Sequence, residues 1–491
     1  MGMRKTDSMV TPPFLFALFF VVGIACSKLL MSLSMISWLV WTVVHILKTQ
    51  TWQEFKTRMA LRLSENRWIV LVFSFVLLHI LSLFWSDHIS EGVDGIRVRL
   101  TFLIIPLLLI FTLQFSKKQS IAIVTFLLYT FVVLVLVNVL RYQILLNKGE
   151  MLDIRQLSFF GSHIRFGVFL SFSALLAYYN WTEKAVSNGF FITYLGMVVL
   201  YTIYSQVLSA YGALLIVGST MVYHYLKTIN RVHFFWWAGL LSLVAVILFL
   251  LAVMGQPEQC PSFAQPNLAA SYWGKKSVFP FHGADAKKQP LKRTLERYLC
   301  SKKRPFSEQD IQSMSPLEVS HVEKGFTSVD QASGGFLTKV EEVQFQLYEA
   351  KDPNGHSLLQ RLVFWKAALV VISKNPWLGV GIGDVQEALN QQYQGQSRLK
   401  KENYRRPHNM FLTTFVAVGI LGVFLLVLLF GLGFYRSITR KHALLFSFLC
   451  ISLLSMMVED SIETQAGISF FSFFLGLFLS DGDANPRLKI D

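Results

Sequence analysis

Long apolar runs dominate this chain, and they recur at a length that suits helices crossing a membrane. A bilayer core is spanned by about 20 apolar residues of helix. We therefore predict an all-α, polytopic membrane bundle of about twelve transmembrane helices with one large loop region outside the membrane. The predicted spans lie near 12–26, 29–47, 67–84, 97–114, 119–140, 162–180, 188–204, 208–226, 233–254, 409–435, 443–457 and 465–480.

The longest interruption of the apolar pattern divides the chain into three regions. Residues 1–254 contain the N-terminal spans, and residues 409–491 contain the last spans and a short tail. The segment between them is polar at first and is expected to be a loosely structured subdomain. An amphipathic helix then runs along the membrane surface, because apolar side chains dominate one of its faces. In order, this middle region comprises a polar insert at 255–357, the amphipathic helix and a glycine-rich turn at 358–384, and a basic segment at 385–408.

Basic residues in the connections predict which side of the membrane each loop occupies. With a cytoplasmic N-terminus, the inner loops carry most of the Lys and Arg, and short outer loops carry acids such as Glu459 and Glu463. This asymmetry favours two cytoplasmic termini and an external segment 255–408. Arg97 and Arg99 depart from the pattern, because they fall at the outer end of a span.

The charge balance is basic, with 45 Lys and Arg against 30 Asp and Glu, a formal charge of +15. Such an excess can indicate nucleic acid, but only 15% of the residues are charged. Much of the excess lies in predicted cytoplasmic loops, where it faces anionic lipid. We therefore expect membrane lipids and not nucleic acid as its partner, while the basic external segment suits an anionic substrate.

The four cysteines fall into two classes. Cys26 and Cys450 lie in predicted spans, where a cysteine packs as a small apolar residue. Cys260 and Cys300 lie in the external segment, where an oxidising compartment permits a disulfide. The sequence leaves open whether these two are bonded.

Three glycines alternate with other residues at Gly379, Gly381 and Gly383. A dinucleotide-binding fingerprint would need a further glycine where Asp384 stands, and no Gly-Lys-Ser/Thr follows. The pattern predicts a tight turn whose backbone approaches another element closely.

His408 and Asn409 follow a basic cluster and stand where a long apolar run begins. An imidazole titrates near neutral pH and can accept a proton from an attacking hydroxyl. The alternative is an interfacial histidine at a helix start that Asn409 caps. Arg405 and Arg406 either anchor the chain at the interface or bind an anion.

Two further arginines stand among apolar neighbours. Arg361 interrupts the apolar face of the amphipathic helix, so a partner is expected. That partner is a diphosphate, which guanidinium binds in bidentate fashion, or Asp384, Glu387 or a lipid headgroup. Arg165, at the outer start of a span, either snorkels or faces a cavity shared with Arg361.

Other chemistries find little support. Asp481-Gly482-Asp483 has the spacing of a metal-binding pair in lipid-linked glycosyltransferases, yet it falls in the predicted cytoplasmic tail. No zinc-type spacing and no Gly-x-Ser-x-Gly occurs. Charges within the spans are few, which disfavours an ion-driven transporter.

The pattern from Arg361 to Gly422 resembles the O-antigen ligase/polymerase superfamily of bacterial inner-membrane glycosyltransferases. It consists of Arg361 with Trp365, then Pro376-Trp377-Leu378-Gly379-Val380-Gly381-Ile382-Gly383, His408-Asn409 with Phe411-Leu412, and Val418-Gly419-Ile420-Leu421-Gly422. The resemblance implies a metal-independent, cofactor-free enzyme of the inner membrane. Its donor would be a glycan on undecaprenyl pyrophosphate, and its acceptor a hydroxyl of lipid A core, glycan or protein.

The resemblance also assigns roles. Arginines, including Arg361, would hold the pyrophosphate, and His408 would assist the acceptor. Members often have Ser-Arg-Gly where this chain has Ala210-Tyr211-Gly212, so Tyr211 replaces an expected arginine. We hypothesise that Arg165 or Arg405 supplies that charge. Three functions remain open: a ligase-like transferase, a polymerase joining lipid-linked repeat units, and a flippase of lipid-linked sugar.

Overall fold

The computed structural model divides the chain into two compact units. The first comprises residues 1–235, 368–389 and 406–491, and the second comprises 236–367 and 390–405. Helices form the regular structure of the described part of the chain, which contains no named β-strand. That part comprises residues 10–112, 115–148, 154–229, 260–286, 289–302, 305–329, 343–344, 346–347, 353–354, 356–396 and 398–480.

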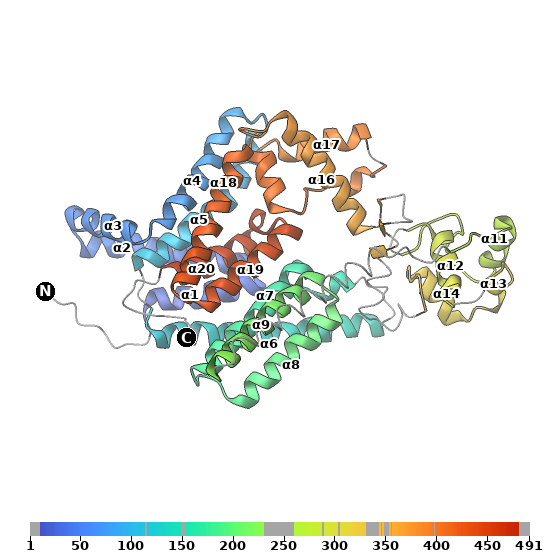
Figure 1. Cartoon of the computed structure of the whole chain (residues 1–491), viewed down its shortest axis with the longest axis horizontal. Helices are drawn as coiled ribbons and strands as arrows, with labels where there is room; N and C mark the ends of the chain where they lie inside the picture. The colour runs from blue at the N-terminus through green and yellow to red at the C-terminus, as the bar shows by residue number, and fades with distance from the viewer. Residues whose placement is uncertain are drawn as a thin grey trace. The chain divides into compact units, whose positions relative to one another are not determined.

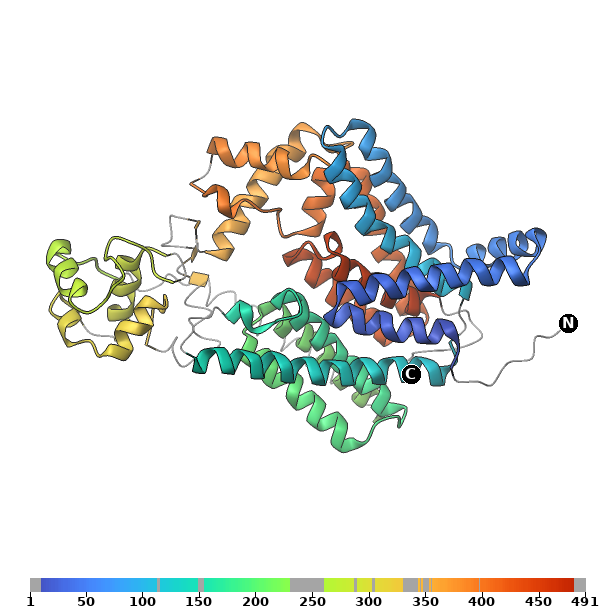
Figure 2. The same ribbon diagram turned by 180° about the vertical axis from the view of Figure 1, so that it is seen from behind.

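The first unit is a helical bundle (Figures 1 and 2). The predicted spans are confirmed as helices, except for 233–254, which lies outside the described residues. The helices are α1 (Pro12–Cys26), α2 (Lys28–Thr49), α3 (Trp52–Glu65), α4 (Trp68–Leu81), α5 (Ile89–Thr112), α6 (Lys117–Asn147), α7 (His163–Thr182), α8 (Asn188–Ser205), α9 (Leu208–Thr228), α18 (Met410–Thr439), α19 (Ala443–Val458) and α20 (Gln465–Leu479), with short 3₁₀ turns η1 (Ser82–Trp85), η2 (Ile154–Leu157) and η5 (Ser461–Glu463).

Six of the described helices are long and apolar enough to cross a membrane, and three shorter apolar helices, α1, α19 and α20, accompany them. The protein is therefore a polytopic membrane protein, while the full number of twelve spans stays a prediction. The six candidates are Lys28–Thr49, Trp68–Trp85, Ile89–Thr112, Lys117–Asn147, Asn188–Ser205 and Met410–Thr439.

Helix α20 forms the core of the bundle. All its residues from Gly467 to Leu479 are buried, as expected for a helix that is apolar on every side. It packs against α5, α1 and α19. Phe172 of α7 and Phe448 of α19 meet Phe470 and Phe474 of α20 with ring centroids 5.0–6.2 Å apart. Helix α20 therefore serves as a scaffold for the helices that pack around it.

The glycine turn packs into a break in α18. Val418 and Gly419 leave helical geometry, and the freed backbone groups bond to the turn. The amides of Val380 and Gly381 donate to the carbonyls of Val416 and Ala417 at 2.8 and 2.9 Å. The amide of Ile420 donates to the carbonyl of Pro376 at 3.0 Å. Non-helical backbone in a membrane must find hydrogen-bond partners within the protein. The turn and the break in α18 provide these partners for each other.

The predicted close approach of the glycine turn is thereby confirmed. Gly379 and Gly381 have positive φ angles of 67° and 94°, a region that favours glycine. A Cβ at Gly379 would meet Ala417 carbonyl carbon at 2.6 Å. A Cβ at Gly381 would collide with the side chain of Ser86, and one at Gly383 with the carbonyl of His88. The turn thus fits between α18 and the α4–α5 connection only with glycine at these three positions.

Replacing Gly419 by alanine should strongly destabilise the first unit. Gly419 has a φ of 66°, and a Cβ there would overlap the carbonyl of Trp377. Left-handed strain and overpacking together predict a loss of about 2–5 kcal/mol, measured by unfolding in detergent. Gly218→Ala is the matched control, because Gly218 lies in helix α9 with open space around it. Equal stability of the two variants would contradict the assigned role of the break.

The second unit contains a small helical subdomain with its own core. Its helices are α11 (Pro266–Gly274), α12 (Leu291–Cys300), α13 (Asp310–Ser313) and α14 (Pro316–Glu323), and Trp273 and Tyr298 are buried among them. Cys260 and Cys300 form a disulfide with their Cα atoms 5.8 Å apart. The expectation of a loosely structured insert is therefore wrong for residues 260–329. Short helices carry too little periodicity to be visible, and packing of large aromatic residues compensates for their length.

The chain then continues into three further elements. Helix α16 (Ser357–Lys374) confirms the amphipathic helix predicted at 358–373. Helix α17 (Val385–Gln396) and the turn η4 (Lys401–Asn403) follow in the predicted basic segment. The division of the sequence at residues 254 and 408 stays a prediction, since the compact units exchange segments along the chain.

Candidate active site

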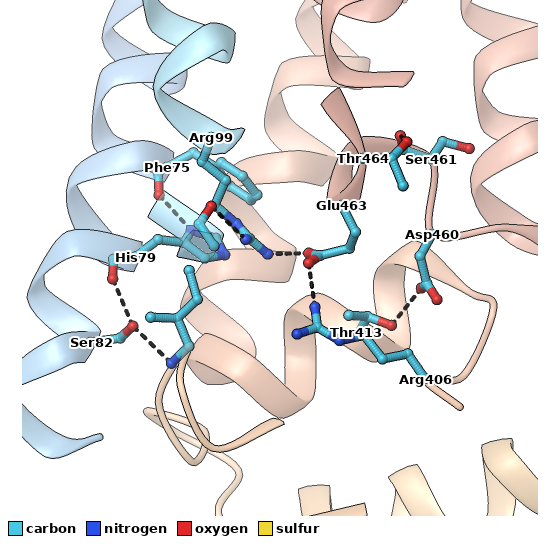
Figure 3. A network of polar contacts seen from close by, with 12 residues as sticks. Phe75, His79, Ser82, Arg99, Arg406, Thr413, Asp460, Ser461, Glu463 and Thr464 are labelled. Carbon is cyan, nitrogen blue, oxygen red and sulfur yellow. Dashed lines mark hydrogen bonds and ion pairs between the residues drawn. The ribbon is translucent and has the colours of Figure 1, made fainter. Parts of the chain in front are cut away.

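The acidic connection between α19 and α20 organises a polar cluster in the first unit (Figure 3). It contains Glu459, Asp460 and Glu463, and each is less than one-tenth exposed. The hydroxyl of Thr464 accepts from the amide of Gly467 at 3.4 Å and starts the core helix α20. The three carboxylates are thereby fixed on a rigid element.

Glu463 bridges two arginines, one with each carboxylate oxygen. Arg99 of α5 pairs with Oε1, and Arg406, just before α18, pairs with Oε2 (Figure 3). Arg99 is 1% exposed and Arg406 is 33% exposed. A buried cation requires such a partner, because desolvation is costly without one. Glu463 therefore ties α5 to the segment that leads into α18.

Asp460 holds the start of α18. Its Oδ1 accepts from the hydroxyl of Thr413 at 2.6 Å, and its Oδ2 accepts from the backbone amide of His408 at 3.0 Å. Burial raises the pKa of this carboxyl, although the bond from Thr413 acts in the opposite direction. The contact holds His408 at a φ of 52°, an uncommon left-handed conformation for a side-chain-bearing residue.

The imidazole of His408 faces a carboxylate. Its Nδ1 lies 3.7 Å from Oε2 of Glu459, and its side chain is 34% exposed. Asn409 caps α18, since its Oδ1 accepts from the amides of Phe411 and Leu412 at 3.1 Å. The predicted cap is thus confirmed, and the imidazole lies beside the carboxylate of Glu459. An accessible imidazole with a carboxylate nearby is able to serve as a general base.

Arg165 joins the same cluster from α7. It is half-buried, and both Glu459 and Asp460 interact with its charge. Its Nε is buried without a hydrogen-bond partner among the described residues. Arg165 and His408 therefore both interact with the carboxylate of Glu459, and donor capacity remains at Arg165.

The remaining predicted site residues are Arg361, Arg405 and Tyr211. Arg361 on α16 and Arg405 belong to the second unit, so their roles stay predictions. A guanidinium N–H of Arg405 donates to the carbonyl of Tyr404 at 2.7 Å. Tyr211 on α9 donates its phenol hydrogen to the carbonyl of Ile203 at 3.4 Å. The pair Asp481 and Asp483 lies outside the described residues. The structure thus brings Arg165, Arg406, His408 and Asn409 together.

The comparison with known families supplies the decisive observation. Residues 190–427 match the family model described as O-antigen ligase. The chain carries an O-antigen ligase family domain. A search of curated proteins found no match. The family match confirms the resemblance and implies a membrane enzyme of the O-antigen ligase/polymerase type that transfers glycans from lipid-linked substrates.

More than half of the cluster lies outside the matched O-antigen ligase segment. Arg406, His408 and Asn409 fall within it, whereas Arg165 precedes it and the acidic α19–α20 connection follows it. The sequence did not indicate that Arg99, Thr413 and the three acids of the α19–α20 connection belong to this cluster. A signal was present, because Arg99 broke the charge asymmetry and the three acids stood together in one short loop.

A second contact fixes the glycine turn of the O-antigen ligase domain. Oδ1 of Asp384 lies 2.6 Å from Nδ1 of His88, and its carboxylate also accepts the amides of Asp87 and His88 at 2.8 and 2.9 Å. The hydrogen bond to Asp384 raises the pKa of His88. Burial alone would raise the pKa of Asp384, but the bonds from Asp87 and His88 lower it. The carboxylate of Asp384 thus fixes the glycine turn to the α4–α5 connection.

The stability that the contact between His88 and Asp384 contributes should depend on pH in a defined direction. Because the pKa of His88 is raised in the folded protein, the contact stabilises the fold below the pKa of about 6.5 that His88 has in the unfolded chain. This stabilisation is lost as the pH rises through the pKa of His88 in the folded protein. A lowered Asp384 pKa adds stability above about 3.9, lost as pH falls through its folded value. The difference in unfolding midpoint between the wild type and the His88→Gln variant should therefore be largest between about pH 4 and 6.5. A difference that grows above this window would contradict the pairing.

Proposed function

We propose that the protein transfers a glycan from undecaprenyl pyrophosphate to a hydroxyl acceptor at the periplasmic face of a bacterial inner membrane, without a metal and with inversion. Both termini would be cytoplasmic and residues 255–408 periplasmic. The observation that supports the proposal is the partly exposed imidazole of His408, with Nδ1 3.7 Å from Oε2 of Glu459, in a cluster that also contains the guanidinium of Arg406. A base and a cation in one cluster are the two groups that such a displacement needs.

His408 orients and deprotonates the acceptor hydroxyl. The acceptor oxygen forms a bond to the anomeric carbon while the bond from that carbon to the pyrophosphate oxygen breaks. The hydroxyl proton passes to the imidazole, and the electron pair leaves with undecaprenyl pyrophosphate. Glu459, 3.7 Å from Nδ1, stabilises the imidazolium that forms. One displacement inverts the anomeric centre.

The arginines bind the pyrophosphate and stabilise its developing charge. Arg165 retains an unbonded N–H, and Arg406 is one-third exposed beside Glu463. Arg361 and Arg405 are proposed to add further guanidinium groups. Preorganised donors of this kind contribute about 3 kcal/mol each to the transition state. A diphosphate is a good leaving group, so no acid is needed to protonate it.

Arg99 has a different role in this proposal. It is buried and its partner Glu463 is shared with Arg406, so it supports the cluster and does not touch the donor. Arg406 presents a partly exposed guanidinium next to Pro407 and His408, where it can bind an anionic group of the donor.

A reconstituted transfer assay tests the function. The full chain is placed in liposomes with synthetic undecaprenyl-pyrophosphate glycan and, separately, lipid A core, a serine-rich protein and a second lipid-linked repeat unit. Mass spectrometry of the product supports a ligase if one of the first two acceptors is modified, and a polymerase if only the third is. Movement of donor between leaflets without transfer to any acceptor would establish the flippase and end the proposal.

Glu459→Gln should lower the transfer rate about tenfold, the value of a lost interaction with a charged group. The donor KM should stay near the wild-type value, because Glu459 touches the imidazole and not the donor. Steady-state kinetics over a donor series separate kcat from KM. An increase in KM with an unchanged kcat would assign Glu459 to donor binding. Glu183→Gln, a carboxylate paired with Lys117 away from the cluster, is the control.

A further inference from the structure

Helix α3 is a well-formed helix without a buried residue. It connects α2 to α4, and all of its 14 residues retain solvent exposure. A capping box starts it, in which Thr51 and Glu54 exchange side-chain and backbone hydrogen bonds. Its place beside the end of α2 is visible in Figures 1 and 2. Packing against the bundle therefore does not explain its presence.

Apolar side chains follow one stripe of α3. Trp52, Phe55, Met59 and Leu63 have the spacing i, i+3, i+7 and i+11, which places them on one face of a helix. Trp52 is 66% exposed, while the other three are half-buried. Leu63, at the C-terminal end, packs on the core of the bundle. The stripe thus continues the apolar surface of the bundle outward and ends in an exposed tryptophan.

Basic residues border this stripe on both sides. At 100° per residue, Lys56 falls on one border and Arg58 and Arg62 on the other, with Glu54 and Glu65 toward the far face. The Lys56 ammonium lies 5.1 Å from the centre of the Trp52 ring. Arg62 makes an exposed pair with Glu65 at 3.8 Å, which leaves it available to other anions. Long basic side chains beside an apolar face suit the boundary between phosphate and acyl chains.

We propose that α3 lies in the headgroup layer of an anionic phospholipid bilayer, with its tryptophan stripe toward the acyl chains. The preceding helix and the segment Trp68–Trp85 after it are both candidate membrane spans. These two flanking segments therefore hold both ends of α3 at the membrane surface. The flanking Lys48 and Arg67 add to the positive charge. Anionic headgroups match this charge, and the acyl boundary matches the stripe.

Spin labels on the full chain test the proposal. Cys26 and Cys450 are replaced by alanine, and a label is attached at Met59→Cys on the stripe or at Thr57→Cys on the exposed side. Collision with oxygen and with a water-soluble nickel complex then reports depth in vesicles containing phosphatidylglycerol. The label at position 59 should lie about 5–10 Å below the phosphates, and that at position 57 should stay in water.

Two controls change the headgroup charge of the vesicles or the basic residues of α3. In phosphatidylcholine vesicles, or with Lys56, Arg58 and Arg62 all replaced by glutamine, the label at position 59 should move toward water. Equal depth in both lipids would show that headgroup charge is irrelevant and overturn the proposal. A label at position 59 that is shielded from both collision reagents would indicate a protein partner instead. A label exposed to the nickel complex in anionic vesicles would show that α3 stands off the membrane.

Discussion

Replacing His408 by alanine should lower glycan transfer by about 10²–10⁴-fold while the protein remains folded. His408 is one-third exposed and contributes its imidazole to no core. The fold around it is held by its backbone amide, which Asp460 accepts at 3.0 Å, and by the Asn409 cap, neither of which needs the ring. The loss should therefore fall on chemistry alone. The rate of product formation at saturating donor, in liposomes, measures it.

His163→Ala is the matched control for this experiment. His163 stands at the start of α7, and its Nε2 lies 2.9 Å from the carbonyl of Ser205, a local contact between helices. Its removal should leave the transfer rate within about threefold of wild type, since surface and structural contacts of this size cost about 1 kcal/mol. Unchanged transfer by the His408 variant would remove the imidazole from the mechanism. Lost donor binding in that variant would instead assign the ring to the pyrophosphate.

Periodicity predicted the elements of the bundle because each helix carries its own signal. The predicted spans coincide with the apolar helices α1, α2, α4 to α9 and α18 to α20, and α16 was predicted as well. The largest difference is at α5, which begins at Ile89 and not near residue 97. The same local information predicted the glycine turn and the Asn409 cap, since both depend on residues that are adjacent in sequence. Helix α3 was missed because its sequence is short and charged, and only four of its apolar residues share one face.

The partners of the site could not be predicted in this way. Arg99 and Glu463 are separated by 364 positions, and only the packing of α20 against α5 brings them together. In the sequence, Arg99 departs from the charge asymmetry, whereas Glu463 is an acid in a short outer loop and fits it. Likewise, the glycines predicted a close approach but not its partner, the break at Val418 and Gly419. Long-range complementarity exists only in the folded chain.

Glu463→Gln should destabilise the first unit by about 3–5 kcal/mol, the cost of leaving a buried charge without its partner. Arg99 is 1% exposed, and its remaining contact is a donation from Nη1 to the carbonyl of Gly95 at 3.2 Å. Neutral glutamine can accept from one arginine but cannot offset two positive charges. Thermal or denaturant unfolding in detergent measures the loss. Glu183→Gln, whose partner Lys117 is about half exposed, should lose less than about 1 kcal/mol.

A double replacement separates the effect of the uncompensated charge from the effect of lost packing around Glu463. Arg99→Met combined with Glu463→Met removes the buried ions together, and apolar groups of similar volume commonly recover the stability that a single replacement loses. We expect the double variant to unfold within about 2 kcal/mol of wild type, far above the single variant. Its transfer activity should nevertheless fall, because Arg406 loses the carboxylate that positions it beside His408. If the double variant is fully active, Glu463 does not position Arg406 for transfer. If it is as unstable as Glu463→Gln, the loss arises from packing around Glu463 and not from the uncompensated charge of Arg99.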